Sequence, residues 1–277
     1  MKEQSLIIGS IGRALTIAGS DSGGGAGIQA DLKTFQELQV YGMTAITAIT
    51  AQNTLGIQAV YPMSPEAVQQ QIEAVGSDIG VDAVKTGMLF SSEIIRVVSD
   101  QVCRFGWKHV VVDPVMIAKG GSTLLQAEAL RSLRAELIPL SYVVTPNIPE
   151  AEAITGLPIR NMEHRQEACK ALFQMGTRHV ILKGGHDESS GNQVVDLFYD
   201  GSHFTEFAGQ RVNTRHTHGT GCTFAAALTA ELAKGTDILQ AVSIAKSFIQ
   251  AAIVHSLGIG HGQGPTNHFA FRELVRA

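Results

Sequence analysis

A glycine loop runs directly into a helix at His216-Thr217-His218-Gly219-Thr220-Gly221-Cys222-Thr223-Phe224-Ala225-Ala226-Ala227-Leu228, and this stretch decides the fold. Phe224, Leu228 and Leu232 recur at four-residue steps, with alanines between them, and Gly235 ends the pattern. The spacing predicts a helix that begins at the end of the glycine loop.

The start of this helix is suited to holding an anion. Gly219 and Gly221 leave backbone N–H groups accessible, and these donors add to the positive end of the helix dipole. The anion would be a phosphate or a charge that develops during group transfer. Cys222 lies at the same terminus, where a thiol pKa tends to fall, so we expect a base or nucleophile there. The alternative is a glycine turn followed by a small buried cysteine.

Composition narrows the classes of protein that this chain can belong to. With 277 residues, 44% hydrophobic and 17% charged, it suits one large α/β domain or two small ones. A net charge of -4 without a Lys/Arg cluster argues against a nucleic-acid partner. No apolar run approaches the roughly 20 residues of a membrane helix, so no membrane partner is expected.

The three cysteines, Cys103, Cys169 and Cys222, are widely spaced and form no Cys-x-x-Cys pair. This pattern argues against a disulfide framework and a cysteine zinc site, and it favours a cytoplasmic protein. Residues 1–13 are interpreted as an N-terminal tail, because their apolar run is too short for a secretory signal. Residues 14–277, without repeats or linkers, are expected to form a single domain, and 187–192 a surface loop.

Short apolar runs alternate with helical patterns along the chain. We expect strands at 14–19, 43–51, 83–85, 109–113, 142–145 and 179–182, a hairpin-like pair at 194–199 and 203–207, and helices around 28–38, 65–75, 91–105, 124–137, 151, 163–175, 221–232 and 238–255. Strand and helix alternation predicts a mostly parallel sheet covered by helices on both faces.

A second glycine loop, Ser20–Gly27, follows the first strand. Gly25-x-Gly27-x-x-Ala30 nominally fits the dinucleotide fingerprint, which also needs an acidic residue about 20 positions later. Residues 38–65 contain no Asp or Glu, so NAD binding is not expected. The loop still offers hydroxyls and the acceptors Asp21 and Asp31 to a polar small molecule, although Asp31 taken alone favours the interpretation as a charge in the first turn of a helix.

Polar side chains follow several of the expected strands. They are Gln52 after the second strand, then Asp113, the pair Asn147 and Glu150, and Lys183. Because the carboxyl ends of parallel strands meet at one edge of a sheet, we expect these groups to converge. The Gln52 amide can donate and accept, which matches the edge of an aminopyrimidine, whereas a glutamine after a strand is often only a solvated loop residue.

The converging groups suit phosphoryl transfer. Asp113, Asn147 and Glu150 offer the oxygen ligands that Mg²⁺ prefers, and Lys183 and Lys119 could counter phosphate charge. Taken singly, an Asp before Pro only ends a strand and Pro-Asn only opens a turn. Together with the glycine anion site they favour phosphoryl transfer, and the absence of a Gly-Lys dipeptide excludes a P-loop enzyme.

Histidines flank the glycine loop at His216 and His218, and two more, His261 and His268, lie in the glycine-rich C-terminal stretch. A His-x-His pair suggests a metal site, but no Cys or third His lies at ligand spacing nearby. We therefore favour helix capping or loop packing for these side chains.

Several strings, in this order, resemble the hydroxymethylpyrimidine/phosphomethylpyrimidine kinases, members of the ribokinase-like superfamily in thiamine biosynthesis. They are Gly19-Ser-Asp-Ser-Gly-Gly-Gly-Ala-Gly-Ile-Gln-Ala-Asp31, Thr50-Ala-Gln-Asn-Thr54, Lys85-Thr-Gly-Met-Leu89, Val112-Asp-Pro-Val-Met116, Thr145-Pro-Asn-x-x-Glu150, Lys183-Gly-Gly185 and His218-Gly-Thr-Gly-Cys-Thr223. The resemblance extends from about Ala14 to Phe271 and is far more specific than any single string.

The resemblance implies a three-layer α/β/α sandwich with a mostly parallel central sheet. It also implies an ATP- and Mg²⁺-dependent kinase that phosphorylates 4-amino-5-hydroxymethyl-2-methylpyrimidine and then its monophosphate, and that forms a homodimer. The residues implied are Gln52, Asp31, Gly19 and Met88 for the pyrimidine, Cys222 with the Gly219, Thr220 and Gly221 amides for catalysis, Lys183, Thr217 and Asn147 for ATP, and Asp113 and Glu150 for the metal. Cys222 occupies the position that is Asp in ribokinase itself.

Two alternatives remain open. Pyridoxal/pyridoxine kinases share the fold and the Gly-Thr-Gly-Cys type of site, but they lack the Thr-Ala-Gln-Asn-Thr string and can carry a second cysteine where this chain has Ala118. A non-catalytic pyrimidine-binding protein would keep the fold without turnover. The apparently complete set of Asp113, Asn147, Glu150 and Cys222 speaks against it.

Overall fold

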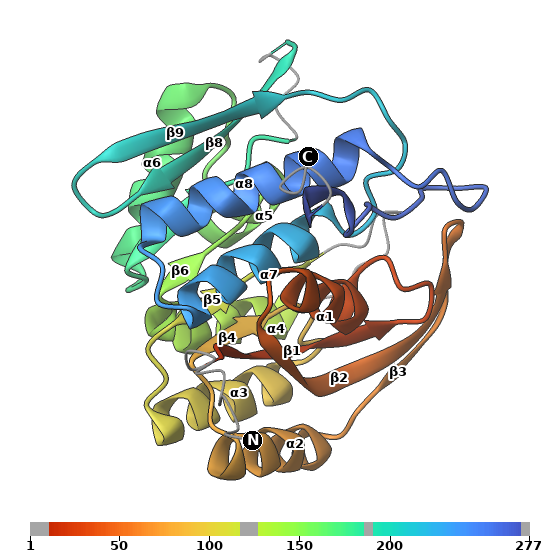
Figure 1. Ribbon diagram of the computed structural model, residues 1–277. Coiled ribbons are helices and arrows are strands. Elements are labelled where there is room, and N and C mark those ends of the chain that lie inside the picture. Colours follow the sequence, from red (N-terminus) through yellow and green to blue (C-terminus); the bar gives the residue numbers. More distant parts are fainter. Residues whose placement is uncertain (1–10, 117–126, 186–190, 273–277) are drawn as a thin grey trace, which may run out of the picture.

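In the computed structural model, which describes residues 11–116, 127–185 and 191–272, nine strands form one central sheet (Figure 1). The strands are β1 (Arg13–Asp21), β2 (Tyr41–Asn53), β3 (Gly56–Pro62), β4 (Ala83–Thr86), β5 (Val110–Val112), β6 (Val143–Val144), β7 (His179–Leu182), β8 (Gln193–Tyr199) and β9 (Phe204–Gln210). They run in the order β3-β2-β1-β4-β5-β6-β7-β8-β9. Neighbours from β2 to β7 are parallel, and β3, β8 and β9 add antiparallel pairs at the two edges.

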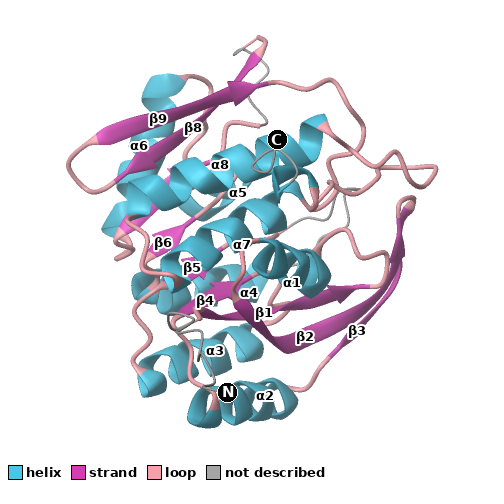
Figure 2. Cartoon of the chain, viewed as in Figure 1, coloured by secondary structure: helices cyan, strands magenta, loops and turns pink. Residues whose placement is uncertain are grey.

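Helices cover both faces of the sheet, which gives the three layers seen in Figure 2. The helices are α1 (Gly27–Glu37), α2 (Pro65–Asp78), α3 (Ser92–Phe105), α4 (Ala127–Ser132), α5 (Ile148–Thr155), α6 (Met162–Gln174), α7 (Thr220–Ala233) and α8 (Ile238–Val254). No helix in the described ranges is long and apolar enough to span a bilayer.

Two hydrophobic cores, one on each face, hold the layers together. On one face α1, α7 and α8 pack against the sheet, with Phe35, Phe224, Leu228 and Phe248 almost completely buried. On the other face α2, α3, α5 and α6 contribute a larger cluster. The parallel strands carry runs of Val and Ile because both of their faces are covered. The expected three-layer α/β fold is therefore confirmed.

Most element boundaries differ from expectation by a few residues, and three differences are larger or concern a whole element. β1 begins at Arg13, within the stretch interpreted as a tail, and Arg13 Nε donates to Asp82 Oδ2 at 2.9 Å. The edge strand β3 was not expected, because its residues are half-exposed and bounded by Gly and Pro, so they show no strand periodicity. Of the helix expected over 124–137, residues 124–126 lie outside the described residues, and the rest forms α4 and a π-helical turn, Leu133–Leu137.

Candidate active site

A cavity of about 710 Å³ opens at the carboxyl ends of the parallel strands, beside the N-terminus of α7. Among the residues expected to form the site, those that line the cavity are Gly19, Gln52, Met88, Asp113, Asn147, Glu150, Lys183, Thr217, Gly219, Thr220, Gly221 and Cys222. They come from strand ends and loops that are far apart in sequence, as the parallel topology requires. Ala118 and Lys119 lie outside the described residues.

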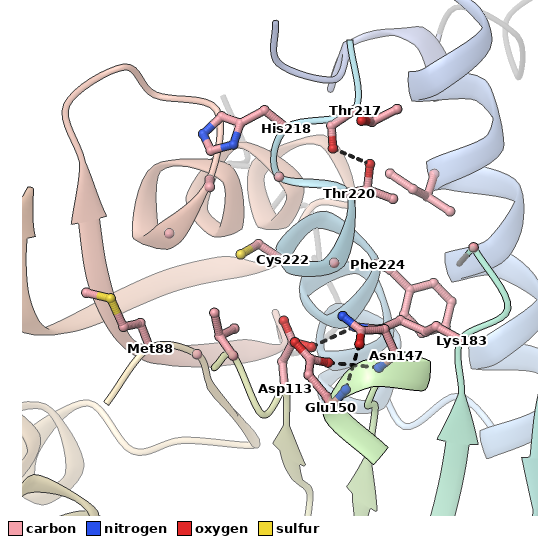
Figure 3. Close-up of a pocket in the computed structure, with 18 of the residues that line it drawn as sticks. Met88, Asp113, Asn147, Glu150, Lys183, Thr217, His218, Thr220, Cys222 and Phe224 are labelled. Carbon is pink, nitrogen blue, oxygen red and sulfur yellow. Dashed lines mark hydrogen bonds and ion pairs between the residues drawn. The ribbon is translucent and has the colours of Figure 1, made fainter. Parts of the chain in front are cut away.

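The first turn of α7 presents free backbone donors to this cavity. Gly219 is the N-cap residue with φ of 81°, and its carbonyl accepts the first helical bond from Thr223 N at 2.9 Å. Within the described part of the chain, the N–H groups of Gly221 and Cys222 have no backbone acceptor. Thr220 Oγ1 donates to the carbonyl of Thr217 at 2.7 Å and fixes the loop before the turn (Figure 3). This arrangement could hold an anion at the positive end of a helix, and we refer to it as the anion site.

The other glycine loop is held by Asp21. Its carboxylate accepts from the backbone N–H groups of Gly23, Gly25 and Ala26 at 2.8, 3.0 and 2.8 Å, and Oδ2 lies 2.8 Å from His218 Nε2. Burial opposes ionisation of Asp21, but these bonds outweigh it and lower the pKa of the carboxyl. The N–H groups of Gly23, Gly25 and Ala26 are therefore hydrogen-bonded to Asp21 within the protein. His218 packs between the two loops, which is the role that the sequence favoured.

Gln52 is left with a free donor toward the cavity. Its Oε1 accepts from Thr50 Oγ1 at 3.1 Å, and its Nε2 lies 3.4 Å from His218 Nε2. We place the His218 Nε2 proton on the shorter contact to Asp21, so the imidazole nitrogen cannot also accept from Gln52. The residue belongs to β2 itself, which holds its backbone rigid beside the ligand space.

Buried charges of alternating sign lie below the α7 terminus (Figure 3). Lys183 Nζ contacts Asp113 Oδ1 at 2.8 Å, and Thr145 Oγ1 donates to the same oxygen at 3.1 Å. A Cβ on Gly221 would lie 3.3 Å from Lys183 Nζ, so the ammonium sits directly against the helix terminus. Burial opposes the charge on Lys183, yet Asp113 and Glu150 raise its pKa. Lys183 is thus a fixed cation at the anion site.

Glu150 serves a capping box at the start of α5. Asn147 N donates to Glu150 Oε2 at 2.8 Å, and Glu150 N donates to Asn147 Oδ1 at 2.9 Å. Burial raises the pKa of the Glu150 carboxyl to about 7, with Asp113 adding to the rise and Lys183 opposing it. An incoming cation would favour the ionised form.

The donor set fits a magnesium ion bound partly through water and phosphate. Asp113 Oδ2 and Glu150 Oε1 have no hydrogen-bond partner among the described residues, so each carboxylate keeps one oxygen free. The Asn147 amide oxygen is already used by the capping box. Within the same described ranges, no cluster of three or more His, Cys, Asp and Glu side chains could hold a metal alone. Two free oxygens beside a phosphate site match the way Mg²⁺ is usually bound.

Two expectations about single residues need correction. Asp31 does not line the cavity, because its carboxylate is completely buried against Lys85, so the expected direct contact with a ligand has no support in the geometry. The pKa of the Cys222 thiol is not lowered by the helix terminus. Burial raises this pKa to about 11, Lys85 lowers it, and Asp31 and Asp113 add to the rise.

A second lobe of the cavity was not found from the sequence. It is bordered by apolar and polar groups of β8, β9, α8 and the segment that follows β9, namely Val194, Asp196, Gln210, Arg211, Val212, Lys246, Ile249, Gln250 and Ile253. Lys246 Nζ contacts Asp196 Oδ2 at 2.6 Å, and Asp196 Oδ1 accepts from Gly184 N at 2.8 Å. The sequence did contain an indication of this lobe, because Lys246 is the single charged residue within the otherwise uncharged helix α8.

Comparison with known proteins gives a consistent result. Residues 21–267 match the family described as phosphomethylpyrimidine kinase. The hydroxymethylpyrimidine/phosphomethylpyrimidine kinase of Bacillus subtilis is 56% identical over 263 residues, which cover 95% of this chain and 97% of that protein. The pyridoxine kinase of the same organism is 44% identical, and the matched residues cover 95% of this chain and 98% of that kinase. The ADP complex of Bacillus subtilis pyridoxal kinase superposes with a TM-score of 0.87 at 42% identity, covering 95% and 100% of the two chains.

The substitution Gly219→Ala at the N-cap of α7 should destabilise the protein strongly. Gly219 and Gly235 flank α7 and both have φ of 81°, but a Cβ on Gly219 would lie 1.7 Å from the Gly25 carbonyl oxygen, whereas one on Gly235 would meet nothing within 4 Å. We expect Gly235→Ala to cost about 1–2 kcal/mol of unfolding free energy, the cost of the left-handed conformation, and Gly219→Ala roughly 3–5 kcal/mol. Urea unfolding measures both, and equal losses would contradict the close approach of the loops.

The Glu150 carboxyl should make stability depend on pH. In the folded chain its pKa is about 7, against 4.5 as the ordinary value, so the unfolded chain loses the proton first as the pH rises. Relative to the isosteric Glu150→Gln variant, the wild type should lose stability between about pH 4.5 and pH 7. Urea unfolding across this range measures the difference, and a difference that does not change with pH would show that the carboxyl is not held protonated.

Proposed function

The chain belongs to the phosphomethylpyrimidine kinase family, and from this premise we propose that it transfers the γ-phosphoryl group of ATP first to hydroxymethylpyrimidine and then to the resulting monophosphate. This is the chemistry named for its 56% identical relative. The product of the second transfer, the pyrimidine pyrophosphate, serves thiamine biosynthesis.

One observation gives this proposal its strongest support. The free N–H groups of the α7 terminus, the Lys183 ammonium and the free oxygens of Asp113 and Glu150 face one cavity. Phosphoryl transfer requires this combination, because catalysis depends on positioning the reactants and on stabilising charge on the transferred group.

The lobe between β1, β2 and the loop after β4 would hold the pyrimidine. Gln52 offers its free amide N–H, and Met88 closes the lobe, since a Cβ on Gly19 would lie 2.4 Å from Met88 Cε. Gly19 therefore leaves room for the Met88 side chain against the backbone of β1. The hydroxymethyl group would point toward Cys222 and the α7 terminus (Figure 3).

The second lobe would hold the nucleotide. Apolar side chains of β8 and α8 border it, and Arg211 and Lys246 supply positive charge. The pyridoxal kinase structure that superposes on this chain is an ADP complex. The γ-phosphate would then reach Lys183 and the α7 N–H groups. Asp113 and Glu150 would hold Mg²⁺, which supplies positive charge to the phosphates and orients them when bound.

The two transfers differ in the proton that must be moved. In the first, the hydroxymethyl oxygen forms a bond to the γ-phosphorus while the bond from that phosphorus to ADP breaks, and the hydroxyl proton must leave. Cys222 would orient this hydroxyl and would take its proton in the thiolate form, which a pKa of about 11 makes the minor form at neutral pH. In the second, the attacking oxygen belongs to an ionised phosphate, so no base is needed.

Two further properties are proposed from the family resemblance. The chain would form a homodimer, and it would work in the cytoplasm, where its free cysteines stay reduced.

The assignment is tested by turnover of three acceptors. Purified enzyme with ATP and Mg²⁺ should phosphorylate hydroxymethylpyrimidine and its monophosphate, with pyridoxal a poor acceptor, as measured by ADP release and mass spectrometry of the products. Turnover of pyridoxal alone would favour the vitamin B6 kinase named for the 44% identical relative. ATP hydrolysis that does not depend on any acceptor would contradict both.

Loss of the Cys222 thiol should affect the two transfers unequally. We expect Cys222→Ala to lower kcat of the first transfer about 100-fold, the usual contribution of acid–base catalysis, and to lower the second far less. The matched control is Cys103→Ala, because Cys103 is exposed on α3. Each transfer is measured separately, starting from hydroxymethylpyrimidine or from the monophosphate. Equal losses in both would exclude a proton-transfer role.

A further inference from the structure

A buried ion pair beneath the cavity has no part in the chemistry described so far. Lys85 Nζ on β4 lies 2.9 and 2.8 Å from the two carboxylate oxygens of Asp31 on α1, and both side chains are 0% exposed. Thr16 Oγ1 donates to Asp31 Oδ2 at 2.6 Å. Asp31 is therefore fully occupied by neighbours, whereas the Lys85 ammonium also borders the cavity.

Lys85 and Cys222 border the same cavity. A Cβ on Gly87 would lie 3.2 Å from Lys85 Nζ, so the backbone beside the ammonium carries no side chain that could cover it. The charges that act on the Cys222 thiol are Lys85 from β4, Asp31 from α1, Asp113 after β5 and Lys183 after β7.

Such a pair is costly for stability alone. Taking two charges out of water costs several kcal/mol per ion, and well-packed apolar residues of similar volume are often as stable or more so. The pair is also asymmetric toward Cys222, because Lys85 lowers the pKa of the thiol more than Asp31 raises it. Lys85 therefore favours negative charge at the sulfur, whereas Asp31 and burial oppose it.

We propose that Lys85 is a positioning residue for the first phosphoryl transfer, which stabilises the Cys222 thiolate, and that Asp31 holds Lys85 in place and limits its effect. The inference rests on the proposed function for its catalytic consequence. As the hydroxyl oxygen bonds to phosphorus, its O–H bond breaks and the proton forms an S–H bond at Cys222. The resulting neutral thiol returns this proton to water between turnovers. Asp31 thus acts on the reaction through Lys85 without touching the substrate.

The test measures the thiol directly, without substrates. In a Cys103→Ser background, alkylation of Cys222 by iodoacetamide is followed against pH by mass spectrometry. Cys169 does not interfere, because it is buried and burial raises its pKa to about 12. Asp31→Asn leaves the Lys85 charge unbalanced, and the double variant Lys85→Met with Asp31→Asn removes both charges.

The two variants should shift the pKa of the Cys222 thiol in opposite directions. At a fixed, mildly alkaline pH we expect alkylation about tenfold faster in Asp31→Asn and about tenfold slower in the double variant, which corresponds to about one pH unit each way. Damage to the fold would change both in the same direction. Rates that move together, or that do not move, would overturn the proposal.

Steady-state kinetics of the two transfers then test whether the pKa of the Cys222 thiol affects catalysis. In the double variant, the ratio of kcat for the first transfer to kcat for the second should fall about tenfold, in line with the thiol shift. A merely structural ion pair would lower both transfers together and leave the ratio unchanged, which would overturn the catalytic part. Because alkylation needs no turnover, its outcome is independent of whether the proposed kinase activity is found.

Discussion

The structure depends on one electrostatic constraint: charges that leave water must be balanced by neighbours of opposite sign. Asp31, Lys85 and Glu150 come from α1, β4 and α5, and Asp113 and Lys183 directly follow β5 and β7. Each lies beside a group of opposite charge at the carboxyl edge of the sheet. The N-terminus of α7, with its free N–H groups, completes this arrangement. A phosphate that enters meets fixed donors, which do not have to reorganise.

The scaffold explains why these groups can be held so firmly. Short parallel strands, buried between two hydrophobic cores, end at nearly the same level, and α7 packs across them with most of its residues buried. The loops around the cavity are tied to one another through Asp21 and His218, and a backbone bridge joins His218 to Pro265 near the C-terminus. The position of the anion site is thus fixed from several sides.

Much of this could be predicted from the sequence, because the patterns concerned are local. Helical spacing after Gly221 located α7, and polar residues after apolar runs located Asp113, Asn147 and Lys183. Burial and pairing between distant segments could not be predicted. The sequence shows Asp31 and Lys85 54 positions apart, with no sign that they form a pair, and a helix terminus predicts a lowered thiol pKa where burial in fact raises it. The second lobe was missed for the same reason, whereas β3 was missed because its half-exposed residues show no strand periodicity.

The central claim is that the transferred phosphoryl group lies at the α7 terminus. It is tested most directly by a crystal structure of the enzyme with ADP, Mg²⁺, hydroxymethylpyrimidine and aluminium fluoride, which imitates the phosphoryl group in transfer. The fluoride should accept hydrogen bonds from the N–H groups of Gly221 and Cys222 and contact Lys183 Nζ. A fluoride bound instead at the Gly23–Ala26 loop, with the α7 terminus unoccupied, would contradict the account.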